Sequence, residues 1–477
     1  MNKLCIVGGG TAGLITALIL KSRFSSLKID IVKSDKIGII GVGEGTTEHW
    51  LDFMQICEIS EKELITETNA TFKGGIMFKD WTKNNYYHNT YGRYAATKFA
   101  WYPAGYAHAI VNNLKSNNYT DPHAWDNKVT PESLPKQYHF NTFKLNEFLL
   151  KKCNEKNINI YNDEITKVNI EKGNIKSIES KKKKYKYDFY IDSTGFKKLL
   201  ISKLGAKWQS YKDHLPMNEA IAFPTKDTDE YTPYTTAKAM SAGWMWRIPT
   251  QGRWGNGYVF DNRYINAEQA KKECEKYLGY KIEIGKNIKF EAGALDKPWI
   301  GNCVATGLSS SFIEPLEASS IGTSIQQAFI LMHMIINYSE EDIKMYNNKF
   351  KVIVENIRDF VLLHYLTGKK DSKFWKQFKP NLPTSLKDNL KKWKNRLPIK
   401  EDFNSEYVLF KPENFSIILK ELNLVDKKSI KKELNDLSKP FKDYLNDSIN
   451  RQINWDKNAV KIGHKQYLTS LEAWLNR

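Results

Sequence analysis

Cysteine is scarce in this 477-residue chain, and its five cysteines stand far apart. Their odd number and wide spacing argue against a zinc-binding cluster and indicate free thiols in a reducing compartment. The chain also has no hydrophobic run that approaches the length of a membrane span, and its mean hydropathy is −0.54. These absences predict a soluble, cytoplasmic protein without a membrane or metal-ion partner.

Tandem repeats are not apparent, and the length suits about three domains or one large enzyme core. The net charge of +18 and the pI near 9.3 would suit a nucleic-acid-binding protein. However, the lysines are scattered along the chain and interleaved with acidic residues and asparagines, which is typical of a solvated surface. The densest basic run, Lys181 to Lys184, falls where a hairpin begins its return strand. We interpret it as exposed surface and expect no nucleic-acid partner.

The N-terminus carries a glycine motif in a specific setting. The apolar strand Leu4 to Val7 runs into a G-x-G-x-x-G turn at Gly8, Gly10 and Gly13, which a helical pattern and a second apolar strand follow. In such a βαβ unit the first glycine allows the tight turn and the second lets backbone approach a pyrophosphate. The third lets helix and strand pack closely. The sequence therefore predicts a dinucleotide site.

One part of that fingerprint is missing. An acidic residue about twenty positions after the turn usually binds the ribose hydroxyls, and Lys33 occupies this position. We expect the adenosine half to be held differently, with Ser34 and Asp35 as candidates.

Three later segments have the composition of ligand-lining loops. Gly41-Val42-Gly43-Glu44 places glycines around a carboxylate and suits a strap close to a flat ligand, although an ordinary turn also fits. Asp192 ends a hydrophobic strand before a turn at Gly195, and Gly307-Leu308 follow another such strand. Ligands of open α/β sheets bind at the carboxyl ends of strands, so these segments are candidates for lining a cofactor.

The segment Gly243 to Pro249 is predicted as a strand on which Trp244 and Trp246 share a face and form a wall of indoles. An ordinary core strand fits that stretch equally well. The segment Thr71 to Trp81 is also predicted as a strand, with Lys73 and Gly75 on one face. Partial burial could lower the pKa of Lys73 and free its amine for chemistry, although most lysines lie on the surface.

Pro315 is predicted as the first residue of an apolar helix, with Glu317 in the first turn. A carboxylate there can simply complement the helix dipole, so this segment alone leaves the role of Glu317 open.

The order of these segments resembles that of the flavin-dependent halogenases of the tryptophan halogenase family. The resemblance spans about the first 330 residues, and the W-x-W-x-I-P pattern at Trp244 to Pro249 beside the glycine turn is its most specific part. It implies an α/β fold with an FAD-binding Rossmann-like core of the glutathione-reductase/hydroxylase type and an inserted β-sheet substrate region, expected over residues 1–335. A mostly helical C-terminal subdomain is expected over residues 336–477. Further matching segments are Gly41 to Glu44, Phe72-Lys73, Tyr138 to Phe140, Asp192 to Phe196 and Phe312 to Glu317.

The resemblance also implies a cofactor and a reaction. Reduced FAD (FADH2) and O2 would oxidise a halide ion to hypohalous acid, and the halide would lie at Ser319 and Ser320. Trp244 and Trp246 would keep the organic substrate away from the flavin, so that oxygen is not transferred as in a monooxygenase. The cofactor-binding residues implied are Gly8, Gly10, Thr11, Ala12, Gly13, Gly41, Val42, Gly43, Glu44, Asp192, Thr194, Gly195, Gly307 and Leu308.

In the family an essential lysine holds the oxidised halogen, and Lys73 matches it, while Glu317 matches the neighbouring carboxylate. These two are the catalytic residues implied, acting on a small electron-rich aromatic such as an indole or phenol. We see no nicotinamide site, so we expect a separate NAD(P)H-dependent flavin reductase to supply FADH2. The oligomeric state, including a homo-oligomer, stays open.

Departures from the family's pattern bear on the halide. Family members usually have Ser and Gly where this chain has Ala318 and Ser320, so we expect an altered halide pocket that prefers bromide or iodide to chloride. A flavin-dependent aromatic monooxygenase shares the fold and the glycine turn and is the alternative function. It would consume NAD(P)H and give an oxygenated product without halide.

Overall fold

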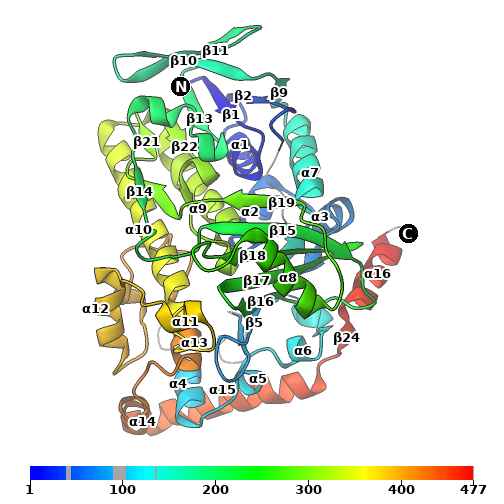
Figure 1. Cartoon of the computed structure of the whole chain (residues 1–477). Coiled ribbons are helices and arrows are strands. Elements are labelled where there is room, and N and C mark those ends of the chain that lie inside the picture. Colours follow the sequence, from blue (N-terminus) through cyan, green and yellow to red (C-terminus); the bar gives the residue numbers. More distant parts are fainter. Residues whose placement is uncertain (39–43, 90–103, 135–136, 476–477) are drawn as a thin grey trace. The chain divides into compact units, whose positions relative to one another are not determined.

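The computed structural model describes residues 1–38, 44–89, 104–134 and 137–475, and the chain forms two compact units (Figure 1). Unit 1 comprises Met1–Ala70, Phe140–Lys212 and Glu291–Glu355, and unit 2 comprises Thr71–His139, Asp213–Phe290 and Asn356–Arg477. The units therefore do not part at residue 335 as expected, because each draws on three separated segments of the chain.

Unit 1 is built on a six-stranded sheet in the order β21-β22-β13-β1-β2-β9. All neighbours are parallel except β21 and β22. The apolar strands β1 and β13 are buried almost throughout, as expected for a parallel sheet covered on both faces. The strands are β1 (Lys3–Val7), β2 (Lys28–Lys33), β9 (Asn159–Asn162), β13 (Phe189–Asp192), β21 (Trp299–Ile300) and β22 (Cys303–Ala305).

Helix α1 (Thr11–Arg23) packs against α7 (Thr142–Glu155) and α9 (Ser319–Met334). Unit 1 also contains two three-stranded sheets. One consists of β10 (Ile165–Glu171), β11 (Asn174–Ser180) and β12 (Lys184–Tyr185), and the other of β14 (Trp208–Ser210), β20 (Gly293–Leu295) and β23 (Ser311–Phe312). The short strand β3 (Glu44–Gly45) also belongs to unit 1. Two further helices are α2 (His49–Cys57) and α3 (Glu61–Thr68).

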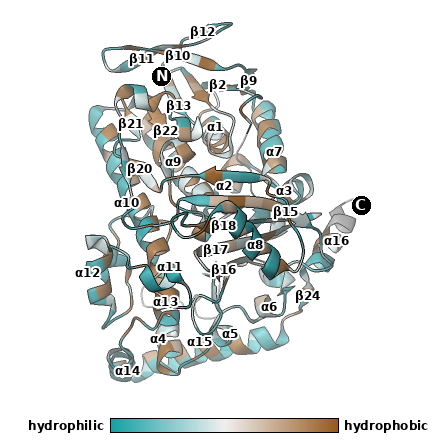
Figure 2. Ribbon diagram, viewed as in Figure 1, coloured by the Kyte–Doolittle hydropathy of each residue, from teal (hydrophilic) through white to brown (hydrophobic). Residues whose placement is uncertain are grey.

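Unit 2 is built on a seven-stranded sheet in the order β19-β15-β18-β17-β16-β5-β6. Only the β16 and β5 pair is parallel. Helix α8 (Ala267–Leu278) buries Ala270 and Cys274 in a cluster with Met245 and Tyr258 and shows a hydrophilic outer face (Figure 2). The strands are β5 (Ile76–Lys79), β6 (Tyr86–His88), β15 (Glu219–Lys226), β16 (Thr235–Met240), β17 (Gly243–Thr250), β18 (Arg253–Phe260) and β19 (Lys286–Lys289).

Among the described residues after 335, the regular structure is helical apart from the short β24 (Ile462–Gly463), which pairs with β7 (Lys128–Val129). The helical conformation is interrupted between Asp436 and Lys439, because Pro440 has no N–H to bond back to the preceding turn. The helices are α10 (Glu340–His364), which runs from unit 1 into unit 2, α11 (Lys373–Gln377), α12 (Thr384–Trp393), α13 (Pro412–Glu421), α14 (Lys427–Asp436), α15 (Lys439–Asn458) and α16 (His464–Leu475). Unit 2 also contains α4 (Ala104–Val111), α5 (Ser116–Tyr119) and α6 (Pro122–Trp125).

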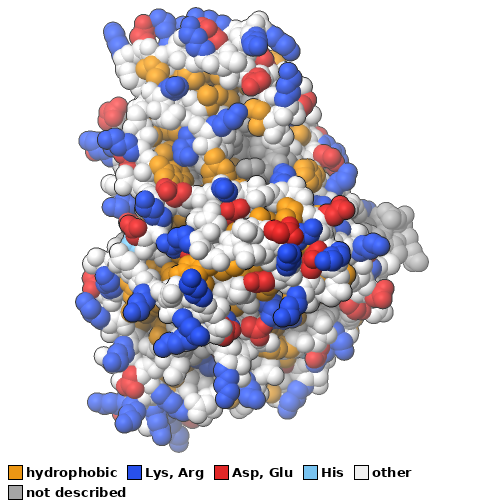
Figure 3. Space-filling view, viewed as in Figure 1, with side chains coloured by type: hydrophobic (Ala, Val, Ile, Leu, Met, Phe, Trp, Pro, Cys, Tyr) orange, Lys and Arg blue, Asp and Glu red, His pale blue; other side chains and the backbone are white. Residues whose placement is uncertain are grey.

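Among the described residues, no helix combines the length and apolar character needed to cross a membrane. All five cysteines are free and buried. Lysine and arginine side chains are spread over the face shown in Figure 3, with aspartate and glutamate between them. The positive net charge is therefore distributed over this face, as the interleaved sequence pattern predicted.

Candidate functional site

The glycine turn joins β1 to α1 and precedes the parallel strand β2, so the predicted βαβ unit is confirmed. Gly8 has φ +114°, and a Cβ there would lie 2.1 Å from the carbonyl oxygen of Ser193. A Cβ on Gly13 would lie 2.9 Å from the carbonyl oxygen of Gly8, whereas one on Gly10 would meet nothing within 4 Å. The fold itself requires Gly8 and Gly13, and Gly10 leaves open space for a ligand.

The N-terminus of α1 has the properties of an anion site. Gly10 is the N-cap and supplies no side chain to the free N–H groups, and the first turn carries no acidic residue. The N–H groups of Thr11 and Ala12 belong to this first turn, where the helix dipole favours negative charge. Together with the space at Gly10, these groups fit the pyrophosphate of a dinucleotide.

Asp192 is fully buried at the carboxyl end of β13. One carboxylate oxygen accepts three hydrogen bonds: from the Thr194 N–H at 3.0 Å, from the Thr194 hydroxyl at 2.7 Å and from the Ser309 hydroxyl at 3.2 Å. The other accepts the N–H groups of Leu200 at 2.7 Å and Ile201 at 2.9 Å. The carboxylate therefore fixes the loop that carries Thr194 and Gly195. No sequence pattern indicated that Ser309 contributes to this site.

The loop after β22 reaches the glycine turn. Gly307 has φ +60°, and a Cβ there would lie 2.5 Å from the Cβ of Ala12, so only glycine allows this approach. The short 3₁₀ helix Gly307–Ser309 contains Leu308. Gly41, Val42 and Gly43 lie outside the described residues, and Glu44 is described only as the start of β3.

Lys33 ends β2, and its side chain lies against the glycine turn, since a Cβ on Gly9 would be 2.6 Å from Lys33 Cδ. The Lys33 ammonium forms an ion pair with the Asp35 carboxylate. Asn162, at the end of β9, donates its side-chain amide to the other Asp35 oxygen at 2.5 Å and accepts the Asp35 N–H at 3.2 Å. A carboxylate is thus held two residues beyond the position where the fingerprint usually has one.

The prediction that Pro315 begins a regular helix with Glu317 in its first turn is wrong. Helix α9 begins at Ser319, after a short 3₁₀ turn in which Glu317 has φ 72° and Ala318 has φ 52°. An α-helix requires negative φ, so the backbone cannot continue from Pro315 into α9. Left-handed conformations of non-glycine residues cost about 1–3 kcal/mol each and cluster at functional sites. The Glu317 side chain is 4% exposed.

The N-terminus of α9 is a second candidate anion site in unit 1. Its N-cap is Ala318, which offers no side-chain hydrogen bond, and its first turn has no acidic residue. Ser319 is buried and Ser320 is exposed, and their carbonyl groups accept the hydroxyls of Thr323 and Ser324. The N–H groups of the first turn thus lack a side-chain cap and can bind an anion such as a halide.

Lys73 does not lie within a continuous strand, so that prediction is wrong. β4 (Thr71–Phe72) pairs with β8 (Tyr138–Phe140), whereas β5 joins the seven-stranded sheet. The residues that link β4 to β5 form backbone hydrogen bonds with other segments. The Lys73 N–H donates to the Gln137 carbonyl at 2.8 Å, and the Gly74 N–H donates to the Pro233 carbonyl at 2.7 Å. A Cβ on Gly75 would lie 2.3 Å from the His88 carbonyl oxygen. The Lys73 side chain is 2% exposed.

Two buried histidines belong to the same region as Lys73. His139 contacts the hydroxyls of Thr71 at 3.2 Å and Thr235 at 2.9 Å, and burial, followed by the positive charge of Lys73, lowers its pKa well below the usual value. His464 accepts the Phe72 N–H at 3.1 Å, and burial lowers its pKa to about 4. Both imidazoles are therefore neutral at pH 7 and leave positive charge at this site to Lys73.

Trp244 and Trp246 lie on β17, as predicted, and are 2% and 5% exposed. Their ring centroids are 6.1 Å apart with an interplanar angle of 55°. Trp246 pairs with Gly257 of β18, where a Cβ would lie 2.1 Å from two atoms of the indole. Gly257 is therefore the residue that makes room for this part of the wall.

The sequence also offers aromatic candidates for the substrate pocket, although core packing fits them equally well. One of them, the stretch Phe99 to Pro103, lies outside the described residues. Tyr106 and His108, the other two candidates, lie on α4, with Tyr106 buried and the pKa of His108 lowered by burial. The expected site residues of unit 1 thus form two candidate anion sites, and unit 2 carries Lys73 and the tryptophan wall.

Known proteins resemble this chain over most of its length. A family model described as tryptophan halogenase matches residues 3–435. Tryptophan 6-halogenase SttH of Streptomyces toxytricini is 29% identical over 465 residues, which cover 88% of either chain. Tryptophan 7-halogenase RebH of Lentzea aerocolonigenes is 28% identical over 415 residues, 79% of this chain and 78% of RebH. The structure of the tryptophan C-6 flavin-dependent halogenase of taromycin biosynthesis matches with a TM-score of 0.89 at 25% identity, covering 99% of this chain and 100% of that one.

Proposed function

Because the chain belongs to the tryptophan halogenase family and is a flavin-dependent halogenase, we propose that it uses FADH2, O2 and a halide to halogenate an electron-rich aromatic ring. Indoles and phenols are the substrate classes proposed. The observation that carries the halogen step is the burial of Lys73 beside two histidines whose lowered pKa values keep them neutral.

The glycine turn would bind the pyrophosphate of FAD through the N–H groups at the start of α1, with Gly10 leaving the space that the phosphates need. Asp192 would act indirectly, by fixing the Thr194 and Gly195 loop at the same edge of the sheet. The chemistry that FADH2 would supply when bound is the two-electron reduction of O2 to the peroxide level, and oxygen at that level would oxidise halide to hypohalous acid. Every further step depends on groups of the protein.

We propose that Asp35 takes the place of the missing fingerprint carboxylate. Its position beyond β2 is fixed by Lys33 and Asn162, so a carboxylate oxygen could accept a ribose hydroxyl while Lys33 donates to another. This role explains how a lysine can stand where dinucleotide-binding proteins usually have an acid.

Lys73 would hold the oxidised halogen, either through a hydrogen bond from its amine to hypohalous acid or as a haloamine. The halogen then replaces a ring hydrogen of the substrate, and the hydroxide oxygen leaves as water after taking up a proton. Glu317 would accept the proton that the ring loses, which suits a carboxylate with little access to water. The left-handed backbone at Glu317 and Ala318 keeps Glu317 out of α9. This conformation would set the orientation of the Glu317 carboxylate.

Trp244 and Trp246 would keep the organic substrate from the flavin. The uncapped N-terminus of α9 at Ser319 and Ser320 would bind the halide. Because Ala318 and Ser320 depart from the family's usual Ser and Gly, we propose a preference for bromide or iodide over chloride. A separate NAD(P)H-dependent reductase would supply FADH2.

The test is mass spectrometry of reactions that contain FAD, a flavin reductase, NADH, O2 and equimolar chloride, bromide and iodide, over a panel of indoles and phenols. Lys73→Ala should abolish halogenated product while NADH consumption continues. Lys79→Ala is the matched control, because Lys79 is a partly buried lysine of the adjacent β5 whose own pKa is lowered by burial. It should retain the activity.

Two outcomes would contradict the proposal. Hydroxylated product without halide would assign the chain to the alternative, an aromatic monooxygenase. Halogenation that persists in Lys73→Ala would show that hypohalous acid leaks to the substrate without a relay. Excess chlorinated product in the mixed-halide reaction would refute the bromide or iodide preference alone.

A further inference from the structure

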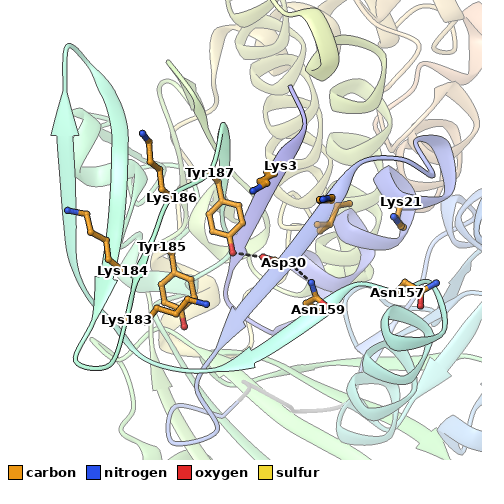
Figure 4. Close-up of a pocket in the computed structure, with 12 residues that line it drawn as sticks. Lys3, Lys21, Asp30, Asn157, Asn159, Lys183, Lys184, Tyr185, Lys186 and Tyr187 are labelled. Atoms are coloured by element: carbon orange, nitrogen blue, oxygen red, sulfur yellow. Dashed lines mark hydrogen bonds between the residues drawn. The ribbon is translucent and has the colours of Figure 1, made fainter.

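A basic hollow of about 520 Å³ lies in unit 1 at the amino-terminal ends of β1 and β2 (Figure 4). This is the edge of the sheet opposite the glycine turn, which follows the carboxyl end of β1. The hollow is therefore separate from the proposed FAD site. Six lysines line it, namely Lys3, Lys21, Lys28, Lys183, Lys184 and Lys186.

The wall of the hollow is held by hydrogen bonds to buried or partly buried groups. The Tyr187 hydroxyl donates to Asp30 at 2.5 Å, and the Asn159 side-chain amide donates to the other Asp30 oxygen at 2.8 Å. Next to them, the Tyr185 hydroxyl donates to Asp163 at 2.7 Å. In Figure 4 Tyr187 points toward Asp30. These contacts anchor Tyr185 and Tyr187, so Lys186 between them projects from a backbone that is held on both sides.

Three of the six lysines already have partners. Lys21 donates to the carbonyl groups of Ser25 and Leu27, and Lys184 forms an ion pair with Glu179 at 3.2 Å. The ammonium of Lys183 lies 4.8 Å from the ring centroid of Tyr161 and 5.0 Å from that of Tyr185.

The other three, Lys3, Lys28 and Lys186, are exposed, and no described side chain forms an ion pair or hydrogen bond with their ammonium groups. Lys3 and Lys28 are direct neighbours in the β1 and β2 register, and like charges at paired positions destabilise a sheet. Asp188 lies near this pair, because its carboxylate accepts the N–H groups of Asn2 and Lys3, and these bonds and the positive charge of Lys3 contribute to lowering its pKa. An external anion would add negative charge beside Lys3 and Lys28 and would reduce the repulsion between them.

We propose that this hollow docks an acidic segment of a protein partner, whose carboxylates pair with Lys3, Lys28 and Lys186. Asp30, Asp188 and Glu179 stand among the lysines, and such mixed charge suits individual ion pairs and disfavours a nucleic-acid backbone. The tyrosines are tied to Asp30 and Asp163 through their hydroxyls, and Lys183 covers Tyr161 and Tyr185, so no aromatic platform is offered to bases.

The test measures fluorescence anisotropy of a labelled octaglutamate peptide with the full chain. The triple variant Lys3→Gln, Lys28→Gln, Lys186→Gln should bind about tenfold more weakly than the unaltered chain at about 20 mM salt, and added salt should narrow the difference. The matched control changes Lys203, Lys207 and Lys297 to glutamine, which removes equal charge from exposed lysines of unit 1 outside the hollow. It should bind within about twofold of the unaltered chain.

Thermal unfolding of both variants separates docking from folding. Removing Lys3, Lys28 and Lys186 should leave the melting temperature unchanged or raise it, since their repulsion is lost. A lower melting temperature in this variant alone would show that the lysines serve the fold and would overturn the proposal. Equal loss of binding in the control variant would also overturn it. Tighter hollow-dependent binding of inorganic triphosphate or of single-stranded DNA would replace the acidic protein segment with a phosphate ligand or a nucleic acid.

Discussion

Lys33 and Asp35 form an ion pair beside the glycine turn, with the Lys33 side chain lying against Gly9 and Asn162 bonded to the same carboxylate. The pair combines a donor and an acceptor where a dinucleotide fold usually presents an acid alone. The proposed adenosine site therefore lies where dinucleotide folds usually have it, but it offers an ammonium donor as well as a carboxylate acceptor.

Asp35→Ala should weaken FAD binding about tenfold, because one hydrogen bond to a charged group is lost. Flavin fluorescence titration measures this without turnover. Asp52→Ala, which removes an exposed acid on α2, is the control and should bind FAD normally. Adding Lys33→Glu to Asp35→Ala should recover affinity, since it restores the usual acid. Unchanged FAD affinity in Asp35→Ala would remove Asp35 from the site.

Gly10→Ala and Gly13→Ala should separate ligand binding from folding. The backbone of Gly10 has φ −79° and space for a Cβ, so Gly10→Ala should melt like the unaltered chain yet bind FAD at least tenfold more weakly, at a cost of about 1.4 kcal/mol. Gly13→Ala should lower both stability and affinity, because its Cβ would crowd Gly8 and Ser193. Normal FAD affinity in Gly10→Ala would argue against a pyrophosphate at this turn.

Gly257→Ala should displace Trp246. The added Cβ would lie 2.1 Å from the indole and 2.5 Å from the carbonyl oxygen of Ile221, so overpacking should cost about 1–3 kcal/mol. Urea unfolding and tryptophan fluorescence report the loss and the changed indole environment. Gly285→Ala is the control, because its nearest contact would be 3.3 Å away. If Gly257→Ala is as stable as this control, the ring does not pack against Gly257 as described.

His464 should make the protein less stable in mild acid. Its folded pKa is about 4 and its unfolded value about 6.5, so only the unfolded chain takes up the proton as the pH falls through this window. The stability that His464 contributes is complete above pH 6.5 and falls by about 2 kcal/mol by pH 5. Urea unfolding at pH 7 and pH 5 measures this loss.

His464→Gln is the comparison, since glutamine can still accept from Phe72 and donate to the Thr232 carbonyl. The variant should lose about 2 kcal/mol less than the unaltered chain between the two pH values. The remaining loss should include that of His139, whose pKa is lowered in the same direction. Equal losses in both proteins would show that His464 does not titrate in this window.

Sequence patterns alone were enough to predict the βαβ unit with its glycine turn and the strand that carries Trp244 and Trp246. Both are local, because glycine spacing and side-chain alternation act within a few residues of chain. The same locality identified Asp192 as the end of a strand, and the family was recognisable from the order of such segments.

The way in which Lys73, Glu317, Asp192 and Lys33 are held depends on long-range contacts in the folded chain. Lys73 leaves the predicted strand because its backbone bonds to Gln137, and Asp192 is satisfied by groups as distant in sequence as Ser309. Glu317 adopts a left-handed backbone that the surrounding structure must over-determine, because local sterics oppose it. These positions depend on contacts between residues far apart in the chain, and no periodicity within a segment encodes such contacts.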